Sequence, residues 1–414
     1  MENNIRNIEE EELPTCDKLF SLELLAFKLI GLGSLQSAFE KNNKIAVTFL
    51  EIFLFLCGFG VLIVLVFSAS YTVSIFLSID LTLACEILTF IFSTTITLGK
   101  VLRLWIYRMD LIKILREFND LWEENARKRQ DLKEEIYKII NDSKPIRYSY
   151  FIVAGLLSMS YGMRPYFLML CYFLKQSENK TMDLKETVYP IIYPIPSGTW
   201  PGWLSCVTYE QGIIFFGMIY WIACDTLFIL LTSHICVHFM IISNDLYKLH
   251  DNHHENNNDN YKLIGELSRR HQKMFVLCQK IETLYSPIVL LTVLFNGVDL
   301  CFCIFALDKE ISEGHWIKVA RSITHALTLF IQIIIYCNFA HMATEQTKTV
   351  SDAIYNSSWL NCDTKMKKIM GIIMMRANKE YKFAAYGLLI LDREQMTRIV
   401  KTTMSYFTLL RSFS

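Results

Sequence analysis

The sequence predicts an all-α membrane protein with seven transmembrane helices, its N-terminus in the cytoplasm and its C-terminus outside. Hydrophobic residues make up 52% of the 414 residues, and the mean hydropathy is +0.29. Seven apolar stretches are long enough to cross a hydrocarbon core ~30 Å thick, which takes roughly 20 helical residues. The 41 lysines and arginines balance the 41 aspartates and glutamates, which excludes the basic surplus typical of nucleic-acid-binding proteins.

The twelve cysteines do not follow a metal-binding pattern. They are scattered singly apart from Cys301 and Cys303, and the sequence has no C-x-x-C or H-E-x-x-H motif. We therefore expect no metal and no cofactor. No nucleophile and base stand out together, so we also expect no enzyme activity. Cys171 and Cys206 are predicted to lie toward the outer side, where a disulfide and two buried thiols are both open alternatives.

Residues 1–44 are predicted to form a cytoplasmic segment with a helix on the membrane surface. The stretch from Leu19 to Leu35 is apolar but is interrupted by Glu23 and Lys28, a pattern typical of such helices. The first two spans follow at about residues 45–68 and 73–98. Residues 100–147 then carry charges of both signs at helical spacing, which predicts a solvated cytoplasmic helix.

The third span covers about residues 148–174 and leads into an outer loop, residues 175–209. This loop is rich in proline and holds Trp200 and Trp203, which indicates either a folded cap over a membrane cavity or an interfacial aromatic belt. Asn179 begins an Asn-Lys-Thr sequon in this loop and is the expected glycosylation site.

The fourth span begins near Glu210, and no glycine or proline interrupts the chain between Met218 and Leu249. Such a helix exceeds the membrane and should project into the cytoplasm. Residues 237–280 are assigned to the cytoplasm and include a polar, Asn-rich stretch at 250–260 with nothing to bury.

The fifth and sixth spans are predicted at about residues 281–307 and 319–341, which completes a six-helix bundle over residues 45–340. Residues 341–391 then form a cytoplasmic anchor segment. With the N-terminus inside, about thirty of the 41 lysines and arginines fall on cytoplasmic segments, as the positive-inside rule requires.

The last stretch, residues 392–414, is predicted to be a pore-lining helix. At 100° per residue one side is apolar. The other side carries the polar residues Arg398, Thr402, Ser405 and Ser412. A charged side is costly to expose to lipid, so it should face water or protein. Near the chain end, Leu409 and Phe413 close off the polar side as in a gate that works by dewetting. The alternative is an ordinary amphipathic surface helix or a bundle helix with a polar contact face.

Several short motifs resemble the insect odorant receptor family, the ligand-gated cation channels of insect olfactory neurons. The carrying segments are Ser405-Tyr406-Phe407-Thr408-Leu409-Leu410-Arg411, Tyr193-Pro194-Ile195-Pro196 with Trp200-Pro201, Asp225 in Ala-Cys-Asp-Thr-Leu, His271 in Arg-His-Gln, Tyr336-Cys337-Asn338-Phe339, and Ala353-Ile354-Tyr355 followed by Trp359. The segment Gly31-Leu32-Gly33 departs from the family because it lacks a Trp-Pro pair.

The resemblance implies a tuning subunit that assembles with the shared co-receptor into a four-subunit, non-selective cation channel in the plasma membrane of olfactory sensory neurons. The final helix of each subunit would line the pore, with Leu409 and Phe413 at its gate. A small volatile odorant would bind in the outer halves of the second, third, fourth and sixth spans. Helical position alone nominates the contact residues Ile79, Met163, Phe167, Phe215, Met218, His325 and Leu329, for which an ordinary core role is the alternative.

Two other receptor classes compete with this interpretation. A gustatory receptor channel of the same superfamily is suggested by the spacing of Ser405-Tyr406 and Ser412-Phe413. A G-protein-coupled receptor would have the opposite orientation and a cytoplasmic tail. The intramembrane charges Arg164, Asp80, Asp299 and Arg321 are expected to pair with one another and hold the bundle together.

Overall fold

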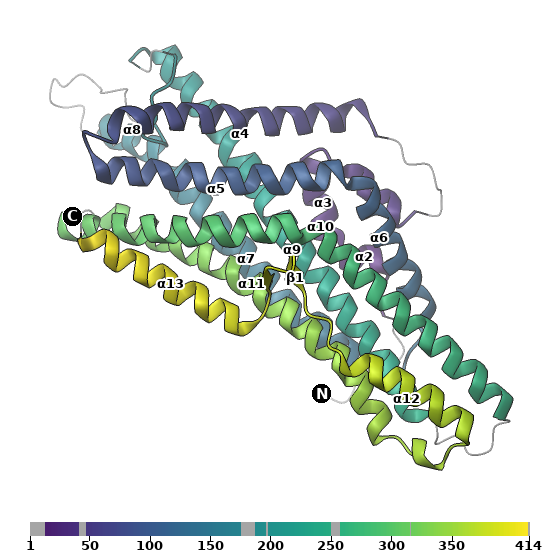
Figure 1. Ribbon diagram of the computed structural model, residues 1–414. Helices are drawn as coiled ribbons and strands as arrows, with labels where there is room; N and C mark the ends of the chain where they lie inside the picture. Colours follow the sequence, from purple (N-terminus) through teal and green to yellow (C-terminus); the bar gives the residue numbers. More distant parts are fainter. Residues whose placement is uncertain are drawn as a thin grey trace, which may run out of the picture.

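Long helices that run side by side dominate the computed structural model of the chain (Figure 1). The structure describes residues 13–40, 47–174, 187–195, 198–249, 257–314 and 316–412. The principal helices are α4 (Phe49–Phe76), α5 (Leu81–Ile106), α7 (Lys133–Gly162), α8 (Arg164–Leu174), α9 (Trp200–Lys248), α10 (Asn257–Ser312), α11 (Trp316–Asn356) and α13 (Arg393–Ser412). The predicted all-α class is confirmed.

The spans occur in the predicted order. Within the described residues, five helices are apolar and long enough to cross a membrane: α4, α5, α9, α10 and α11. The predicted third span is built from α7 and α8 end to end, and the last is the amphipathic helix α13. The turn between the first two spans lies at residues 77–80, later than predicted, because α4 continues through the apolar residues up to Phe76.

The described part of the N-terminal segment packs against the rest of the protein, and its predicted place on the membrane surface stays a prediction. It comprises α2 (Cys16–Leu19), α3 (Ser21–Leu29) and the 3-10 turn η1 (Gly33–Ala38). Glu23, which interrupts the apolar pattern, is fully buried and accepts two hydrogen bonds from the guanidinium of Arg147, at 2.9 and 2.8 Å. The charge that suggested a solvent-facing side instead forms a buried ion pair.

The segment 100–147, predicted as a solvated cytoplasmic helix, is divided among several helices and also buries an apolar face. Helix α5 continues to Ile106, so Lys100 lies within it. The following helix α6 (Arg108–Leu121) and the π-helical turn η2 (Trp122–Ala126) bury an apolar face that includes Leu115, Phe118 and Trp122. This face packs on the N-terminal segment, where the Trp122 indole donates a hydrogen bond to the carbonyl of Pro14 at 2.9 Å. The charged residues occupy only the other face.

Helices α9, α10 and α11 extend well past the thickness of a membrane. They contain 49, 56 and 41 residues, and a 41-residue helix is already ~60 Å long against a core of ~30 Å. Their far ends lie with η3 (Trp359–Asn361) and α12 (Thr364–Asn378) at the lower right of Figure 1. His271 is buried in this region, and burial lowers its pKa to about 4, so the ring is neutral at physiological pH.

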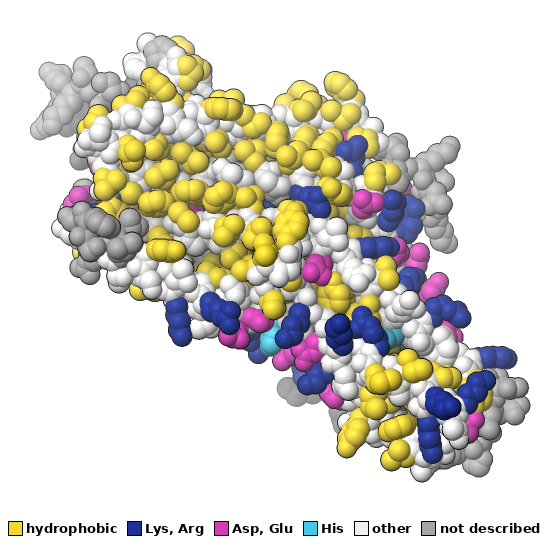
Figure 2. All heavy atoms as spheres, viewed as in Figure 1, with side chains coloured by type: hydrophobic (Ala, Val, Ile, Leu, Met, Phe, Trp, Pro, Cys, Tyr) yellow, Lys and Arg dark blue, Asp and Glu magenta, His cyan; other side chains and the backbone are white. Residues whose placement is uncertain are grey.

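The surface divides along the same line. Figure 2 shows hydrophobic side chains over α4 and α5, and charged side chains gathered on the extension that carries α12. Exposed residues of α4 include Phe49, Phe53 and Phe67, as expected where a helix faces lipid. A short hairpin of β1 (Ala384–Ala385) and β2 (Leu389–Ile390) connects the extension to α13, whose end lies at the opposite end of the bundle from α12 (Figure 1).

Candidate ligand-binding site

A cavity of about 110 Å³ lies inside the membrane bundle, between α4, α5, α7, α9 and α11. Aromatic rings supply part of its wall: Phe90, Tyr161, Tyr189 and Trp221. Aliphatic side chains supply more of it: Leu62, Leu65, Leu157, Ile213, Ile214 and Met218. An apolar cavity of roughly 150 Å³ holds a benzene molecule, so this cavity has the size and polarity for a small apolar compound.

A piece of the outer loop, residues 187–195, closes the cavity from outside. The fully buried carboxylate of Glu210 accepts hydrogen bonds from the backbone N–H groups of Val188 and Tyr189, at 2.8 and 3.1 Å, and from the Tyr193 hydroxyl at 2.9 Å. This anchoring places the Tyr189 ring against Phe90 in an edge-to-face contact, 4.8 Å between ring centroids. The described part of the loop is therefore a folded cap, one of the two predicted alternatives.

One side of the cavity is polar. Ser93 of α5 and His325 of α11 belong to the wall, and the carboxylate of Asp299 on α10 lies behind them, fully buried. The Ser93 hydroxyl donates to Asp299 Oδ2 at 2.7 Å and lies 3.3 Å from His325 Nε2. The other oxygen of Asp299, Oδ1, has no hydrogen-bond partner among the described residues. We call Ser93, Asp299 and His325 the wall cluster.

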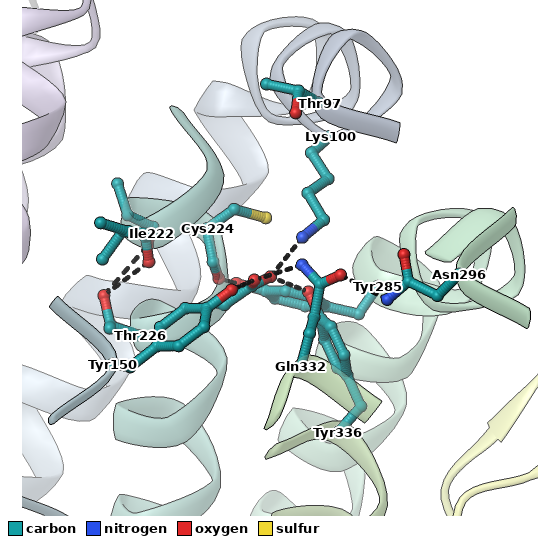
Figure 3. A network of polar contacts seen from close by, with 12 residues as sticks. Thr97, Lys100, Tyr150, Ile222, Cys224, Thr226, Tyr285, Asn296, Gln332 and Tyr336 are labelled. Atoms are coloured by element: carbon teal, nitrogen blue, oxygen red, sulfur yellow. Dashed lines mark hydrogen bonds and ion pairs between the residues drawn. The ribbon is translucent and has the colours of Figure 1, made fainter. Parts of the chain in front are cut away.

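The inner end of the cavity rests on a second polar cluster (Figure 3). Lys100, Asp225 and Gln332 each lie one helical turn beyond a cavity residue, namely Thr97, Trp221 and Thr328. Asp225 Oδ1 accepts from Lys100 Nζ and the Tyr336 hydroxyl, both at 2.5 Å. Oδ2 accepts from Tyr150 at 2.7 Å and from Gln332 Nε2 at 2.6 Å.

All five side chains are fully buried, and they come from α5, α7, α9 and α11. We call them the floor cluster. It joins four helices beneath the cavity through one carboxylate.

The structure brings two of the nominated ligand residues to the cavity, Met218 and His325. Leu329 is buried but is not part of the wall, and four others lie exposed on the outside of the bundle: Ile79, Met163, Phe167 and Phe215. These residues lie away from this cavity. A helix in a membrane is apolar on both its lipid side and its cavity side, so periodicity alone does not separate the two. The polar residues Ser93, Thr94 and Thr97, spaced along one side of the apolar helix α5, are the signal that would have found the wall.

Three of the four intramembrane charges predicted to pair with one another, namely Arg321, Asp299 and Asp80, contact other residues. Arg321 pairs with Glu86, and its guanidinium stacks over Tyr161, 4.9 Å from the ring centroid. Asp299 belongs to the wall cluster. Asp80 caps the first turn of α5, where its Oδ1 accepts from the Leu83 N–H at 3.0 Å. Glu86, the partner of Arg321, was not among the charges predicted to pair.

Helix α13 has two different faces. Ile399 and Thr403 are buried. The Thr403 carbonyl accepts a hydrogen bond from the Cys301 thiol of α10, with 3.4 Å between sulfur and oxygen. Arg398, Thr402 and Ser405 of the predicted polar face are exposed. Asn179 and Phe413 lie outside the described residues, as do the side chains of Cys171, Leu409 and Ser412.

Comparisons with known proteins agree with this arrangement. The family model described as 7tm odorant receptor matches residues 80–404. Odorant receptor 67c of Drosophila melanogaster is 24% identical over 204 residues, which is 49% of this chain and 48% of that protein. Odorant receptor 22c of the same species is 22% identical over 331 residues, 76% of this chain and 78% of that protein. The chain thus spans about half the length of the first of these relatives.

A solved structure has the same fold over nearly the whole chain. The insect olfactory receptor OR5 from Machilis hrabei superposes with a TM-score of 0.76 at 15% identity, covering 96% of this chain and 100% of that chain. The same receptor in complex with eugenol matches with the same TM-score and coverage, at 14% identity. Because the family model covers well over half of the sequence and the helices follow the same course, this multi-pass membrane chain belongs to the 7tm odorant receptor family.

Proposed function

We propose that this chain is the ligand-binding subunit of an odorant-gated cation channel, and that a small volatile compound in the cavity opens a pore lined by α13. The observation that supports this proposal most is the mainly apolar cavity of about 110 Å³ in a chain of the odorant receptor family. Apolar burial in such a space needs little hydrogen-bond geometry, which suits volatile compounds.

The faces of α13 support its role as the pore helix. Its apolar side is packed on α10 through Ile399 and Thr403, whereas Arg398, Thr402 and Ser405 remain uncovered in the single chain. A polar side at membrane depth requires water or other protein against it. Four such subunits around an axis, with the shared co-receptor among them, would surround a water-filled lane, and Leu409, Ser412 and Phe413 would stand at its outer, constricted end.

Helix α10 offers a path from the cavity to the pore. It carries Asp299 of the wall cluster, and two residues later Cys301, which touches the backbone of α13. Nearer the start of α10, two residues hold the β1–β2 hairpin: the Ser286 hydroxyl donates to the Ala384 carbonyl, and the Glu282 carboxylate accepts from the Ala384 N–H. Ligand binding opens the pore only if the ligand binds the open arrangement more tightly than the closed one, and a shift of α10 would move both regions together.

The test of this function is whole-cell current in cells that express the chain alone, with an insect olfactory co-receptor, or with neither, under a panel of volatiles. With the co-receptor present, we expect an odorant-evoked cation current that survives blockade of G proteins. We also expect the chain in the plasma membrane, as for a receptor of olfactory neurons. A current abolished by that blockade would overturn the channel mechanism. Responses confined to sugars or bitter compounds would assign a gustatory function.

Adjacent threonines on α13 test the pore assignment. Thr402 is exposed and Thr403 is buried against α10, so Thr402→Cys and Thr403→Cys differ only in the face they occupy. We expect a charged, membrane-impermeant thiol reagent to block most of the current through Thr402→Cys channels. Wild type and Thr403→Cys serve as controls and should be unaffected. Equal block of both variants, or block of neither, would show that this side of α13 does not line the pore.

A further inference from the structure

The wall cluster has a defined arrangement of donors and acceptors. Ser93 Oγ lies between the other two side chains, 2.7 Å from Asp299 Oδ2 and 3.3 Å from His325 Nε2. The direct distance from His325 Nε2 to Asp299 Oδ2 is 3.9 Å, which is too long for a hydrogen bond. Serine therefore links the imidazole to the carboxylate.

Counting protons along this link fixes which nitrogen of His325 carries hydrogen. A serine hydroxyl has one proton to give, and when Asp299 is ionised that proton goes to its carboxylate. Ser93 Oγ is then an acceptor toward His325, so the hydrogen lies on Nε2. A neutral imidazole has only one N–H, and a buried site disfavours the charged ring. His325 Nδ1 is consequently a bare acceptor.

That acceptor has no partner within the described residues. No hydrogen bond of His325 involves Nδ1, although the residue forms part of the cavity wall. The hydroxyls of Thr97, Ser158 and Thr328, which also line the cavity, donate to carbonyls of their own helices. They are therefore not available as donors to the imidazole.

Trp221, another residue of the cavity wall, carries a second unpartnered polar atom. The indole Nε1 of Trp221 is buried and makes no hydrogen bond among the described residues. Among the described residues, the wall thus includes an unpartnered acceptor on His325 and an unpartnered donor on Trp221, in a space lined mainly by apolar side chains. A hydroxyl group is able both to donate and to accept, whereas an ether or a ketone only accepts.

We propose that the wall cluster makes this subunit selective for small ligands that carry a hydroxyl group, alcohols or phenols of about the size of benzene, whose O–H donates to His325 Nδ1. This inference rests on the proposed function only in placing the ligand in this cavity. His325 accepts the ligand proton, and Ser93 and Asp299 are positioning residues that hold the imidazole in the required tautomer. An analogue that lacks the donor leaves the buried acceptor unpaired, which costs free energy, so the site should reject it.

The experiment compares four molecules with one carbon ring: cyclohexanol, cyclohexanone, methoxycyclohexane and cyclohexylamine. Concentration–response curves for current are measured with the co-receptor present. Binding to the purified protein is measured in parallel by quenching of intrinsic tryptophan fluorescence, which reads occupancy without gating. We expect cyclohexanol to act and bind at about tenfold lower concentration than the ketone and the ether.

The variant His325→Phe keeps the size of the wall but removes the acceptor, and should bring the alcohol and the ether to within about threefold of each other. Ile323→Ala changes an exposed residue two positions earlier on α11 and should keep the wild-type preference. If the ligands bind but evoke no current, the proposed channel function is overturned, and the selectivity can still be measured from the binding curves. The inference is overturned if the ether, ketone or amine is preferred, if the preference survives in His325→Phe, or if none of the four binds.

Discussion

Two fully buried aspartates in the membrane bundle have opposite surroundings. Asp225, in the floor cluster, accepts four hydrogen bonds, one of them from the ammonium of Lys100. Asp299, in the wall cluster, accepts one, from Ser93, and keeps an oxygen without any partner among the described residues. The first carboxylate is saturated and the second is not.

The difference separates a structural role from a binding role. Burying a charge is costly unless it is paired and hydrogen-bonded, and the floor cluster meets this condition with groups from four helices. In the wall cluster, one acceptor of Asp299 and one of His325 have no partner among the described residues, and an acceptor beside a cavity gains most from a ligand that satisfies it. We therefore assign the saturated cluster to holding the helices together and propose that the unsaturated one selects the ligand.

Replacing each aspartate with leucine should reduce stability much more at Asp225, in the floor cluster, than at Asp299. Asp225→Leu leaves the Lys100 ammonium buried without a counter-ion and removes the acceptor of three further donors. Removing one partner of a buried pair typically costs about 3–5 kcal/mol. We expect the variant to lose most of its surface delivery and to unfold at a clearly lower temperature in detergent, measured by tryptophan fluorescence.

A second substitution controls for general damage. In Asp225→Leu with Lys100→Met, both charges are replaced by apolar side chains, which is often close to neutral for a buried pair. Recovery of most of the lost thermal stability in the double variant supports pairing as the cause. A single Asp225→Leu variant that melts like wild type would refute the structural role of the floor cluster.

The sequence alone points to the two aspartates but not to their partners. Asp225 and Asp299 are recognisable because each is an acid inside an apolar span, and the spans themselves follow from hydrophobic length. Their partners are not recognisable, since Lys100 is 125 residues away from Asp225 and stands near the end of a span, where a lysine normally extends its charge to the interface. Which residues face the cavity depends on how helices pack against each other, which is why Met218 and His325 were found and Ser93 and Trp221 were not.

Tyr336→Phe has the next largest expected effect, because it removes one of the four donors to Asp225. Hydrogen bonds to charged groups contribute about 1.5–3 kcal/mol. Tyr285→Phe is the matched control, since the Tyr285 hydroxyl donates to a neutral acceptor, the Cys224 carbonyl, at 3.1 Å, and such bonds contribute about 0.5–1.5 kcal/mol. The Tyr336→Phe variant should unfold at a lower temperature than the Tyr285→Phe variant. The reverse order would argue against the charged acceptor as the centre of the floor cluster.

The smallest effect on stability is expected for Asp299→Leu, within about 1 kcal/mol of wild type, because the carboxylate it removes is poorly compensated. Its effect should appear in ligand choice. Without the carboxylate, the Ser93 hydroxyl is free to donate to His325 Nε2, so the ring proton moves to Nδ1 and the cavity wall presents a donor. Cyclohexanone should then gain on cyclohexanol, measured by the concentrations for half-maximal fluorescence quenching. A variant as stable as wild type that still prefers the alcohol would show that Asp299 does not set the tautomer of His325, and would remove the distinction between the two aspartates on which the selectivity of this cavity rests.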